Sequence, residues 1–317
     1  MVDPRILIAV LAMACEAGPK GAGDLAAARR ESRSSAYEAP SRAELDGASR
    51  LFDDLLAPRP DVGKARALAA QCDLELLEVD APGDSILVVR ETAAARRGRG
   101  FFAFRPGQRR PLAIEAPHSF TDRYTGPIAE KLFLESGAAA AAWNTVARSA
   151  APEGTVYRKE DNRETEGERE REGEKKKEGE ENDSDLAHLP ESFLQEFTRA
   201  FARAHPGGIV LQLHGFDSEA RGGDGPSAIL SDGTRRPGVW VEVAAGCLSD
   251  ALGARTALYP RDTSELGGTS NAQAKLLRAL GSRSFLHLEL SLDRREDLAR
   301  EAELRKRLLL CIPETVP

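Results

Sequence analysis

The 317-residue sequence has few histidines, cysteines and aromatic residues, and it has no long hydrophobic run. No stretch of about 18 or more apolar residues occurs, which argues against a transmembrane helix. The formal net charge of -7 argues against a general nucleic-acid binder, because such proteins normally carry a basic stripe. We find no internal repeat. With 41% hydrophobic residues, however, the chain is able to bury a sizeable core.

The four cysteines form no CxxC pair. If Cys15 belongs to a leader peptide, Cys72, Cys247 and Cys311 remain, which is an odd number. We therefore expect neither a cysteine metal site nor a disulfide framework.

The amino terminus has the pattern of an export signal. The segment RILIAVLAMAC contains one basic residue, nine apolar residues (6–14) and then Cys15. We expect residues 1–15 to be a signal peptide, or a lipoprotein signal in which Cys15 carries a lipid anchor. That anchor would be the only membrane contact. Export to the periplasm or cell envelope is favoured over a cytoplasmic location, and a buried amphipathic start is the alternative.

Two segments have low complexity. Residues 16–60 are rich in Ala, Arg, Ser, Gly and acids with little periodicity, which favours a tether or a fraying helix. In residues 158–185, 21 of 28 residues are charged, so this segment cannot bury enough apolar surface to become ordered. We expect a disordered, solvated insertion there, inside a domain that spans residues 61–312.

The rest of the chain alternates short apolar runs with helical patterns. Strands are expected at residues 85–89, 101–104, 112–116, 138–142, 208–213 and 285–290. Helices are expected at residues 126–135, 190–204, 240–252, 271–279 and 292–309. This alternation predicts an α/β sheet that is covered by helices on both faces.

Polar residues collect where these strands end, which is where open α/β sheets bind ligands. The residues are His118 and Asp122, Asn144 and Arg148, His214, and Glu289. Two neutral imidazoles and one carboxylate make a zinc site with one position left for water. Bound zinc lowers the pKa of that water from about 16 to about 7.

The remaining groups suit the other tasks of such a reaction. Glu289 is a candidate general base, and Arg148, with Asn144 beside it, is a candidate for binding a substrate carboxylate. Each residue also has a plain structural interpretation, because a histidine at a strand end is often structural and Glu289 fits a solvated edge strand. His205 precedes a proline and fits a helix end. His287 either orients Glu289 or belongs to the core.

Six short motifs occur in the order IEAPHSFTD, WNTVAR, DLAH, IVLQLHGF, GGTSNAQ and FLHLELS. In this order they resemble the N-formylglutamate amidohydrolase-like and zinc carboxypeptidase-like hydrolases over about residues 85–296. The resemblance implies a three-layer α/β/α single domain with a mixed sheet and one zinc ion. It also implies His118 and His214 as metal ligands, Glu289 as the base, and an arginine that recognises a substrate carboxylate.

The carboxylate ligand is open. The carboxypeptidase pattern places an acid three residues after the first histidine, where this sequence has Thr121. Asp122 follows directly and Glu115 lies three residues earlier. We favour Asp122, because it lies in the loop after His118 whereas Glu115 still belongs to the strand.

Two further motifs have two interpretations each. Asp185 and His188 in DLAH form either a helix start or a group near the substrate or behind the metal ligands. Asn271 and Gln273 in GGTSNAQ form either a helix cap or part of the pocket wall.

The leading hypothesis is a zinc-dependent amide hydrolase that acts on a small N-acyl amino acid or a peptide-like substrate with a free carboxylate. One alternative is a non-catalytic envelope protein that keeps the fold with a degenerate metal site. Another is a carboxylate-binding module without a metal.

Overall fold

The computed structural model describes residues 24–81, 84–148, 184–218, 225–253 and 255–316. The expected signal peptide and nearly all of the expected charged insertion lie outside these residues. The described strands are β1 (Leu74–Ala81), β2 (Asp84–Glu91), β3 (Phe101–Phe104), β4 (Arg110–Ala116), β5 (Ala138–Trp143), β6 (Ile209–Gly215), β7 (Ala228–Ser231), β8 (Thr256–Leu258) and β9 (Phe285–Leu290).

The strands form one mixed sheet in the order β1-β2-β3-β5-β4-β6-β9-β7-β8. The central strands β5, β4, β6 and β9 are mutually parallel. Antiparallel pairs flank them on both sides, as β3 with β5 and β7 with β9. The prediction of an α/β domain with a mixed sheet is confirmed.

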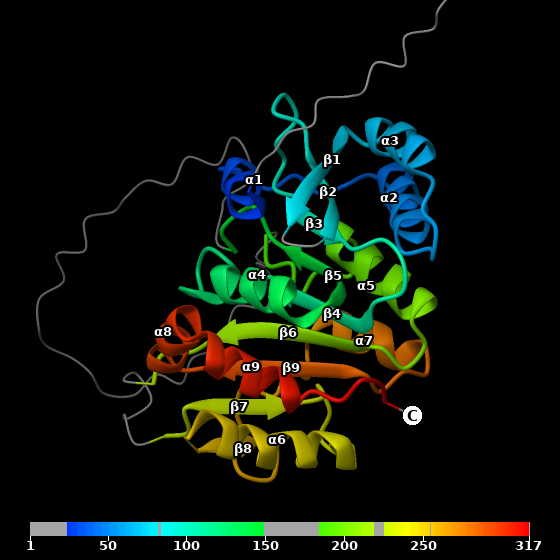
Figure 1. Ribbon diagram of the computed structural model, residues 1–317. Helices are drawn as coiled ribbons and strands as arrows, with labels where there is room; N and C mark the ends of the chain where they lie inside the picture. Colours follow the sequence, from blue (N-terminus) through cyan, green and yellow to red (C-terminus); the bar gives the residue numbers. More distant parts are fainter. Residues whose placement is uncertain (1–23, 82–83, 149–183, 219–224, 254, 317) are drawn as a thin grey trace, which may run out of the picture.

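Helices cover both faces of the sheet (Figure 1). They are α1 (Leu25–Glu31), α2 (Arg42–Leu55), α3 (Val62–Ala70), α4 (Thr125–Ser136), α5 (Phe193–Ala204), α6 (Val239–Leu252), α7 (Ala272–Ala279), α8 (Leu292–Arg300) and α9 (Ala302–Leu310). The buried hydrophobic side chains form two large clusters, one on each face of the sheet. One cluster contains side chains of α1, α4, α6, α8 and α9, and the other contains side chains of α2, α3, α5 and α7.

Strand alternation decides which side chains reach which face. In β6, Leu211 and Leu213 belong to the first cluster and Val210 to the second. Gln212 and His214 share the parity of Val210, so they point to the α5 and α7 face. The same alternation puts Glu115 of β4 on that face. These three polar side chains therefore lie on the same face of the sheet.

The tether expected at residues 16–60 differs from the structure wherever the structure describes it. Helices α1 and α2 occupy much of residues 24–60, and Leu51, Phe52 and Leu55 of α2 are almost fully buried. Helix α2 begins with a capping box between Ser41 and Glu44. This Ser-x-x-Glu spacing before an apolar stripe is the sequence feature that indicates the helix.

The helix expected at residues 292–309 is interrupted at Glu301, whose backbone is extended. No proline or glycine marks the break. Arg305 of α9 donates a hydrogen bond of 2.7 Å to the carbonyl of Leu298, so one carbonyl at the end of α8 keeps a partner. Hydrophobic periodicity continues through the break and therefore does not reveal it.

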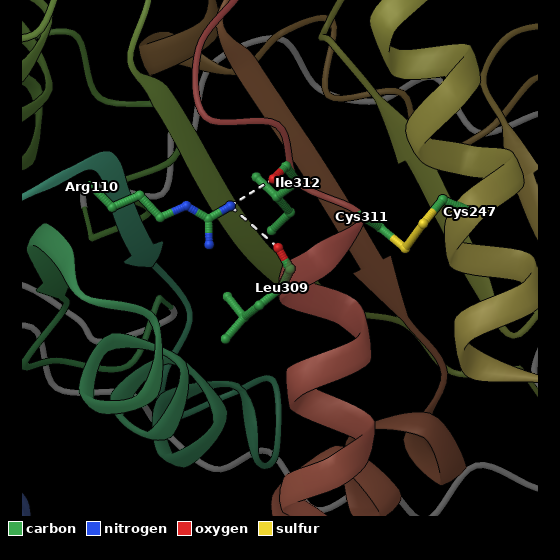
Figure 2. Close-up of a disulfide and its surroundings, with 5 residues drawn as sticks. All are labelled: Arg110, Cys247, Leu309, Cys311 and Ile312. Atoms are coloured by element: carbon green, nitrogen blue, oxygen red, sulfur yellow. Dashed lines mark hydrogen bonds between the residues drawn. A yellow bond between two sulfur atoms is a disulfide. The ribbon is translucent and has the colours of Figure 1, made fainter.

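A disulfide joins Cys247 of α6 to Cys311 at the end of α9 (Figure 2). This bond differs from the expectation of no disulfide framework, because two cysteines 64 positions apart come together only in the folded chain. Close by, Arg110 at the start of β4 donates hydrogen bonds to the carbonyls of Leu309 and Ile312 (Figure 2). The carboxyl-terminal segment is thus tied to both α6 and the central sheet. Cys72 is buried as a free thiol.

Helices of the described residues are all too short or too polar to cross a membrane.

Candidate metal centre and active site

The candidate site lies at the carboxyl ends of the central parallel strands. Strands β4, β6 and β9 are neighbours in the sheet, and each one delivers site residues at that end. His118 and Asp122 follow β4. His214 and Glu289 are the second-to-last residues of β6 and β9, and they are paired in register. Parallel alignment therefore gathers these side chains at one edge of the sheet.

His118 and Asp122 belong to one tight turn after β4. The amides of Thr121 and Asp122 both donate to the carbonyl of His118, at 3.0 and 2.9 Å. This turn puts the two side chains on the same side, with His118 Nδ1 3.4 Å from Asp122 Oδ2. Asp122 Oδ2 also accepts a hydrogen bond of 2.9 Å from the amide of Gly215, so the turn is attached to the end of β6.

The two histidines face each other through like atoms. His118 Nδ1 lies 3.1 Å from His214 Nδ1, and Asp122 Oδ2 lies 4.0 Å from His214 Nδ1. The three side chains are buried, and their ligand-type atoms all lie within 4.8 Å of one another. His214, His287 and Glu289 form a second, overlapping group by the same criterion.

The outer nitrogen of each imidazole has its own partner. His118 Nε2 lies 2.8 Å from Asp185 Oδ1, and His214 Nε2 lies 2.8 Å from Gln212 Oε1. A carboxylate oxygen accepts hydrogen bonds and cannot donate them, so His118 Nε2 carries a hydrogen and donates it to Asp185. In the neutral imidazole this leaves the lone pair on Nδ1, which points at His214.

Burial and the contact between the two groups act in opposite directions on the pKa values of His118 and Asp185. Burial alone would lower the pKa of His118, but hydrogen bonds to Asp122 and Asp185 outweigh it and raise that pKa to about 9. Burial would likewise raise the pKa of Asp185, but the hydrogen bond from His118 lowers it. The pair therefore favours positive charge at the imidazole and negative charge at the carboxylate.

Burial favours the neutral forms of His214 and His287. Burial, followed by the nearby positive groups, lowers the pKa of His214 well below its usual value and that of His287 to about 3. Their ring centroids are 4.5 Å apart, and His287 Nε2 lies 3.8 Å from Glu289 Oε1. A neutral imidazole is the form that binds a metal ion.

Glu115 is engaged elsewhere. Its side chain is fully buried on the α5 and α7 face, where Oε1 lies 2.7 Å from Thr198 Oγ1 and Oε2 accepts a hydrogen bond of 2.8 Å from Gln212 Nε2. Burial raises the pKa of this carboxyl to about 7. Glu115 thus contacts Gln212, the outer partner of His214.

A cavity of about 630 Å³ opens over these groups. Its wall includes the two candidate metal ligands His118 and His214, together with Asp122, His287, Glu289, Arg148, His188 and Asn271. The structure thus brings Arg148, His188 and Asn271 to the same cavity as the candidate metal ligands. Asp185 lies behind His118 and contacts it.

Two of the residues expected to bind substrate lie behind the cavity wall. Asn144 Oδ1 accepts hydrogen bonds from the amide and hydroxyl of Ser119, so Asn144 supports the turn that carries His118. Gln273 is fully buried and donates to the carbonyl of Leu186. The structure differs from the expectation for both, since their polar atoms bind protein groups.

Arg295 of α8 is a supporting residue that the sequence did not reveal. This buried guanidinium donates to the carbonyls of Arg123, Phe216 and Leu290, at 2.7, 3.1 and 3.1 Å. These carbonyls follow β4 and β6 and end β9, the strands that deliver the site. A Cβ at Gly215 would lie 2.4 Å from Arg295 Cζ, so a larger residue there would displace the guanidinium from these carbonyls.

Gln212 and Arg235 are two further site residues that the sequence patterns did not reveal. Gln212 lies two residues before His214, and strand parity is the feature that puts both on one face. Arg235 lines the cavity from the loop after β7, where the sequence has a turn-rich SDGTRRPG stretch and no strand was expected.

No protein-family model and no curated protein matches this chain. Among solved structures, the chain is similar to the N-formylglutamate amidohydrolase from Ralstonia eutropha JMP134, with 13% identity and a TM-score of 0.38, over 68% of this chain and 96% of that one. It is also similar to a bacteriophage poly-gamma-glutamate hydrolase, with 10% identity and a TM-score of 0.33, over 65% of this chain and 83% of that one. The first of these carries the family name that the motifs suggest. At such values the function has to be argued from this chain's own residues.

Proposed function

We propose that this protein is a zinc-dependent amide hydrolase that acts on a small N-acyl amino acid or peptide-like substrate with a free carboxylate. His118, His214 and Asp122 are the metal ligands in this proposal, and Glu289 is the general base. Arg148 binds the carboxylate of the substrate.

The observation that carries the proposal is the approach of two imidazole nitrogens. His118 Nδ1 and His214 Nδ1 lie 3.1 Å apart, and each outer Nε2 is occupied by an acceptor. Two neutral rings in these tautomers would turn lone pairs toward each other, which is unfavourable unless a cation or a proton lies between them. Asp122 Oδ2 beside both nitrogens adds a negative charge at the same point. Two imidazoles and one carboxylate are a donor set that zinc prefers.

Glu115 is not assigned as a ligand, because Thr198 and Gln212 engage both of its oxygens on the α5 and α7 face. Asp122 has the required place beside both histidines. These contacts support Asp122 over Glu115 as the proposed carboxylate ligand.

Zinc bound at these residues would polarise a substrate carbonyl and make a bound water more acidic. Glu289 lies in the same cavity wall, close to His287. Its carboxylate accepts the proton from the attacking water and returns it to the leaving nitrogen. Asp185 and Gln212 orient the two imidazoles through their outer nitrogens.

The cavity offers cations for an anionic substrate. Arg148, His188 and Arg235 all line it. A guanidinium binds a carboxylate through two parallel hydrogen bonds, which fixes the orientation of the substrate as well as its charge. The amide bond to be cleaved then lies between the arginine and the histidine pair.

The test is metal analysis of the purified protein, combined with a hydrolysis panel of N-acyl amino acids and dipeptides. We expect about one zinc per chain, loss of zinc in His118→Ala and His214→Ala, and hydrolysis that stops on chelation and returns with zinc. An exposed histidine variant, His188→Ala, is the matched control and should retain zinc.

Two outcomes would contradict the proposal. Full metal content in both ligand variants would remove the assigned site. Retained zinc without hydrolysis of any compound in the panel would favour the non-catalytic alternative.

A further inference from the structure

A chain of buried amide side chains connects helix α7 to His214. Asn271, Gln212 and Gln273 are all at most 2% exposed. They are linked by hydrogen bonds from Asn271 Nδ2 to Gln212 Oε1 and from Gln212 Nε2 to Gln273 Oε1. Each of these amides has an oxygen that accepts and a nitrogen that donates, so the direction of the chain depends on where it ends.

The ends of the chain are backbone groups, whose roles are fixed. The amide of Ala274 donates to Asn271 Oδ1 at 3.0 Å, as the cap of α7. Asn271 must therefore turn Nδ2 toward Gln212. At the other end, Gln273 Nε2 donates to the carbonyl of Leu186 at 3.1 Å, so Gln273 turns Oε1 toward Gln212.

Both ends impose the same orientation on Gln212. Its Oε1 faces the donor on Asn271, and its Nε2 faces the acceptors on Gln273 and Glu115, at 3.2 and 2.8 Å. Among the described residues, the other hydrogen-bond partner of Oε1 is His214 Nε2, 2.8 Å away. Because an amide oxygen cannot donate, His214 must carry its hydrogen on Nε2 and its lone pair on Nδ1.

We infer that Asn271, acting through Gln212, is a positioning residue that fixes the tautomer of His214 and so turns its Nδ1 lone pair toward His118 and Asp122. The inference deepens the proposed function and rests on it for the role of Nδ1 as a metal ligand. The side chain of Gln212 lies between Asn271 and His214, so Asn271 acts on His214 indirectly. The same Asn271 side chain caps the start of helix α7.

The first turn of α7 also holds the outer partner of the other histidine. The amide of Ala272 donates to the carbonyl of Ala187 at 2.8 Å, and Gln273 donates to that of Leu186. These contacts fasten the segment that carries Asp185, which contacts His118 Nε2. One helix start thus supports the orientation of both imidazoles.

The substitution Asn271→Asp isolates this role. Aspartate keeps an oxygen for the amide of Ala274, so the cap of α7 is retained. It replaces the donor that faces Gln212 Oε1 with a second acceptor, which repels that oxygen. Rotation of the Gln212 amide relieves this repulsion at the cost of its hydrogen bonds to Gln273 and Glu115. In the rotated form Gln212 offers a donor to His214 Nε2, and the hydrogen of His214 moves to Nδ1.

Two measurements follow this change. Nitrogen-15 NMR of the histidine side chains in the metal-free protein should show His214 with hydrogen on Nε2 in the wild type, and a population with hydrogen on Nδ1 in Asn271→Asp. Zinc affinity, measured by competition with a chelator, should fall on the order of 10- to 100-fold. Gln212→Met, which removes the amide altogether, should lower zinc affinity at least as much.

The matched control is Asp61→Asn, which exchanges the same two groups at the cap of α3, where Asp61 accepts from the amide of Lys64. It should change neither the tautomer nor the affinity. An unchanged tautomer and affinity in Asn271→Asp, or a wild-type His214 with its hydrogen on Nδ1, would overturn the inference. A wild type that binds no zinc would overturn the proposed function instead, and the tautomer in the metal-free protein would still decide the role of Asn271.

Discussion

His118 Nε2 and Asp185 Oδ1 lie 2.8 Å apart, across a sequence separation of 67 residues. The carboxylate is on the short segment that precedes α5, and Asp185 also raises the pKa of His118. This contact orients the ring that we propose as the first zinc ligand. It gives the first prediction.

Asp185→Ala should lower zinc affinity about 10- to 100-fold, because the imidazole loses both its orientation and the electron density that the carboxylate supplies. Asp185→Asn should lose less, since the amide oxygen still accepts from Nε2. Chelator competition measures both values. The exposed Glu191→Ala is the control, and an Asp185→Ala variant with wild-type affinity would contradict the prediction.

Glu289→Gln should retain zinc and reduce kcat on the order of 10²- to 10⁴-fold, because an amide cannot accept the proton from water. Metal analysis and steady-state kinetics on the same sample separate the two effects. Glu242→Gln, on the exposed side of α6, makes the same chemical change away from the cavity. Equal turnover in wild type and Glu289→Gln would exclude Glu289 as the base.

Arg148→Met should raise KM roughly 10- to 100-fold for substrates with a free carboxylate, which corresponds to one lost charged hydrogen-bonding contact. For a substrate whose carboxylate is blocked as an amide, KM should be the same in the variant and in the wild type. The comparison of the two substrates in wild type and variant measures the effect directly. If the variant loses as much on the blocked substrate, Arg148 does not bind the carboxylate.

The raised pKa of Glu115 predicts that the stability of the fold depends on pH. Burial raises its pKa from 4.5 to about 7 in the folded protein, so the folded chain holds this proton more tightly than the unfolded chain does. The stabilisation is therefore complete below about pH 4.5 and is lost as the pH rises through about 7, with an upper limit of roughly 3 kcal/mol.

Glu115→Gln should remove this contribution, because glutamine offers a donor to Thr198 and an acceptor to Gln212 at every pH. Urea unfolding of both proteins between pH 4.5 and 8 tests it, with the difference in unfolding free energy between the two as the readout. A difference that stays constant over this range would show that Glu115 titrates normally.

Removing the disulfide between Cys247 and Cys311 should cost up to about 4 kcal/mol, because the bond closes a loop of 64 residues in the unfolded chain. The single variants Cys247→Ser and Cys311→Ser and the double variant should lose similar amounts. Reducing agent should destabilise the wild type and leave the double variant unchanged. An unfolding midpoint that does not respond to reduction would contradict this prediction.

The central strands and the strand-end histidines followed from local sequence patterns. Runs such as 101–104 and 285–290 agree with β3 and β9 at both ends, because strands that are buried on both faces of the sheet are continuous apolar runs between turns. His118 and His214 stand directly after or within such runs. Their mutual approach follows from parallel strands, whose carboxyl ends share one edge of the sheet.

The supporting residues were not accessible in this way. Gln212 and Asn271 are 59 positions apart, and only the folded sheet and α7 bring their amides together. The short strand β8 has three residues and no distinctive pattern. The pairing of Cys247 with Cys311 depends on the packing of α6 against α9, which periodicity within each helix does not report.

Arg295 has a consequence for how this protein diversifies. Its guanidinium binds the ends of the three strands that carry the proposed ligands and base, from outside the cavity. Arg148 and Arg235, in contrast, belong to loops that line the cavity. The strand ends and these loops therefore have separate supports, so substitutions in the loops are able to change which substrate is accepted while the strand ends keep their geometry.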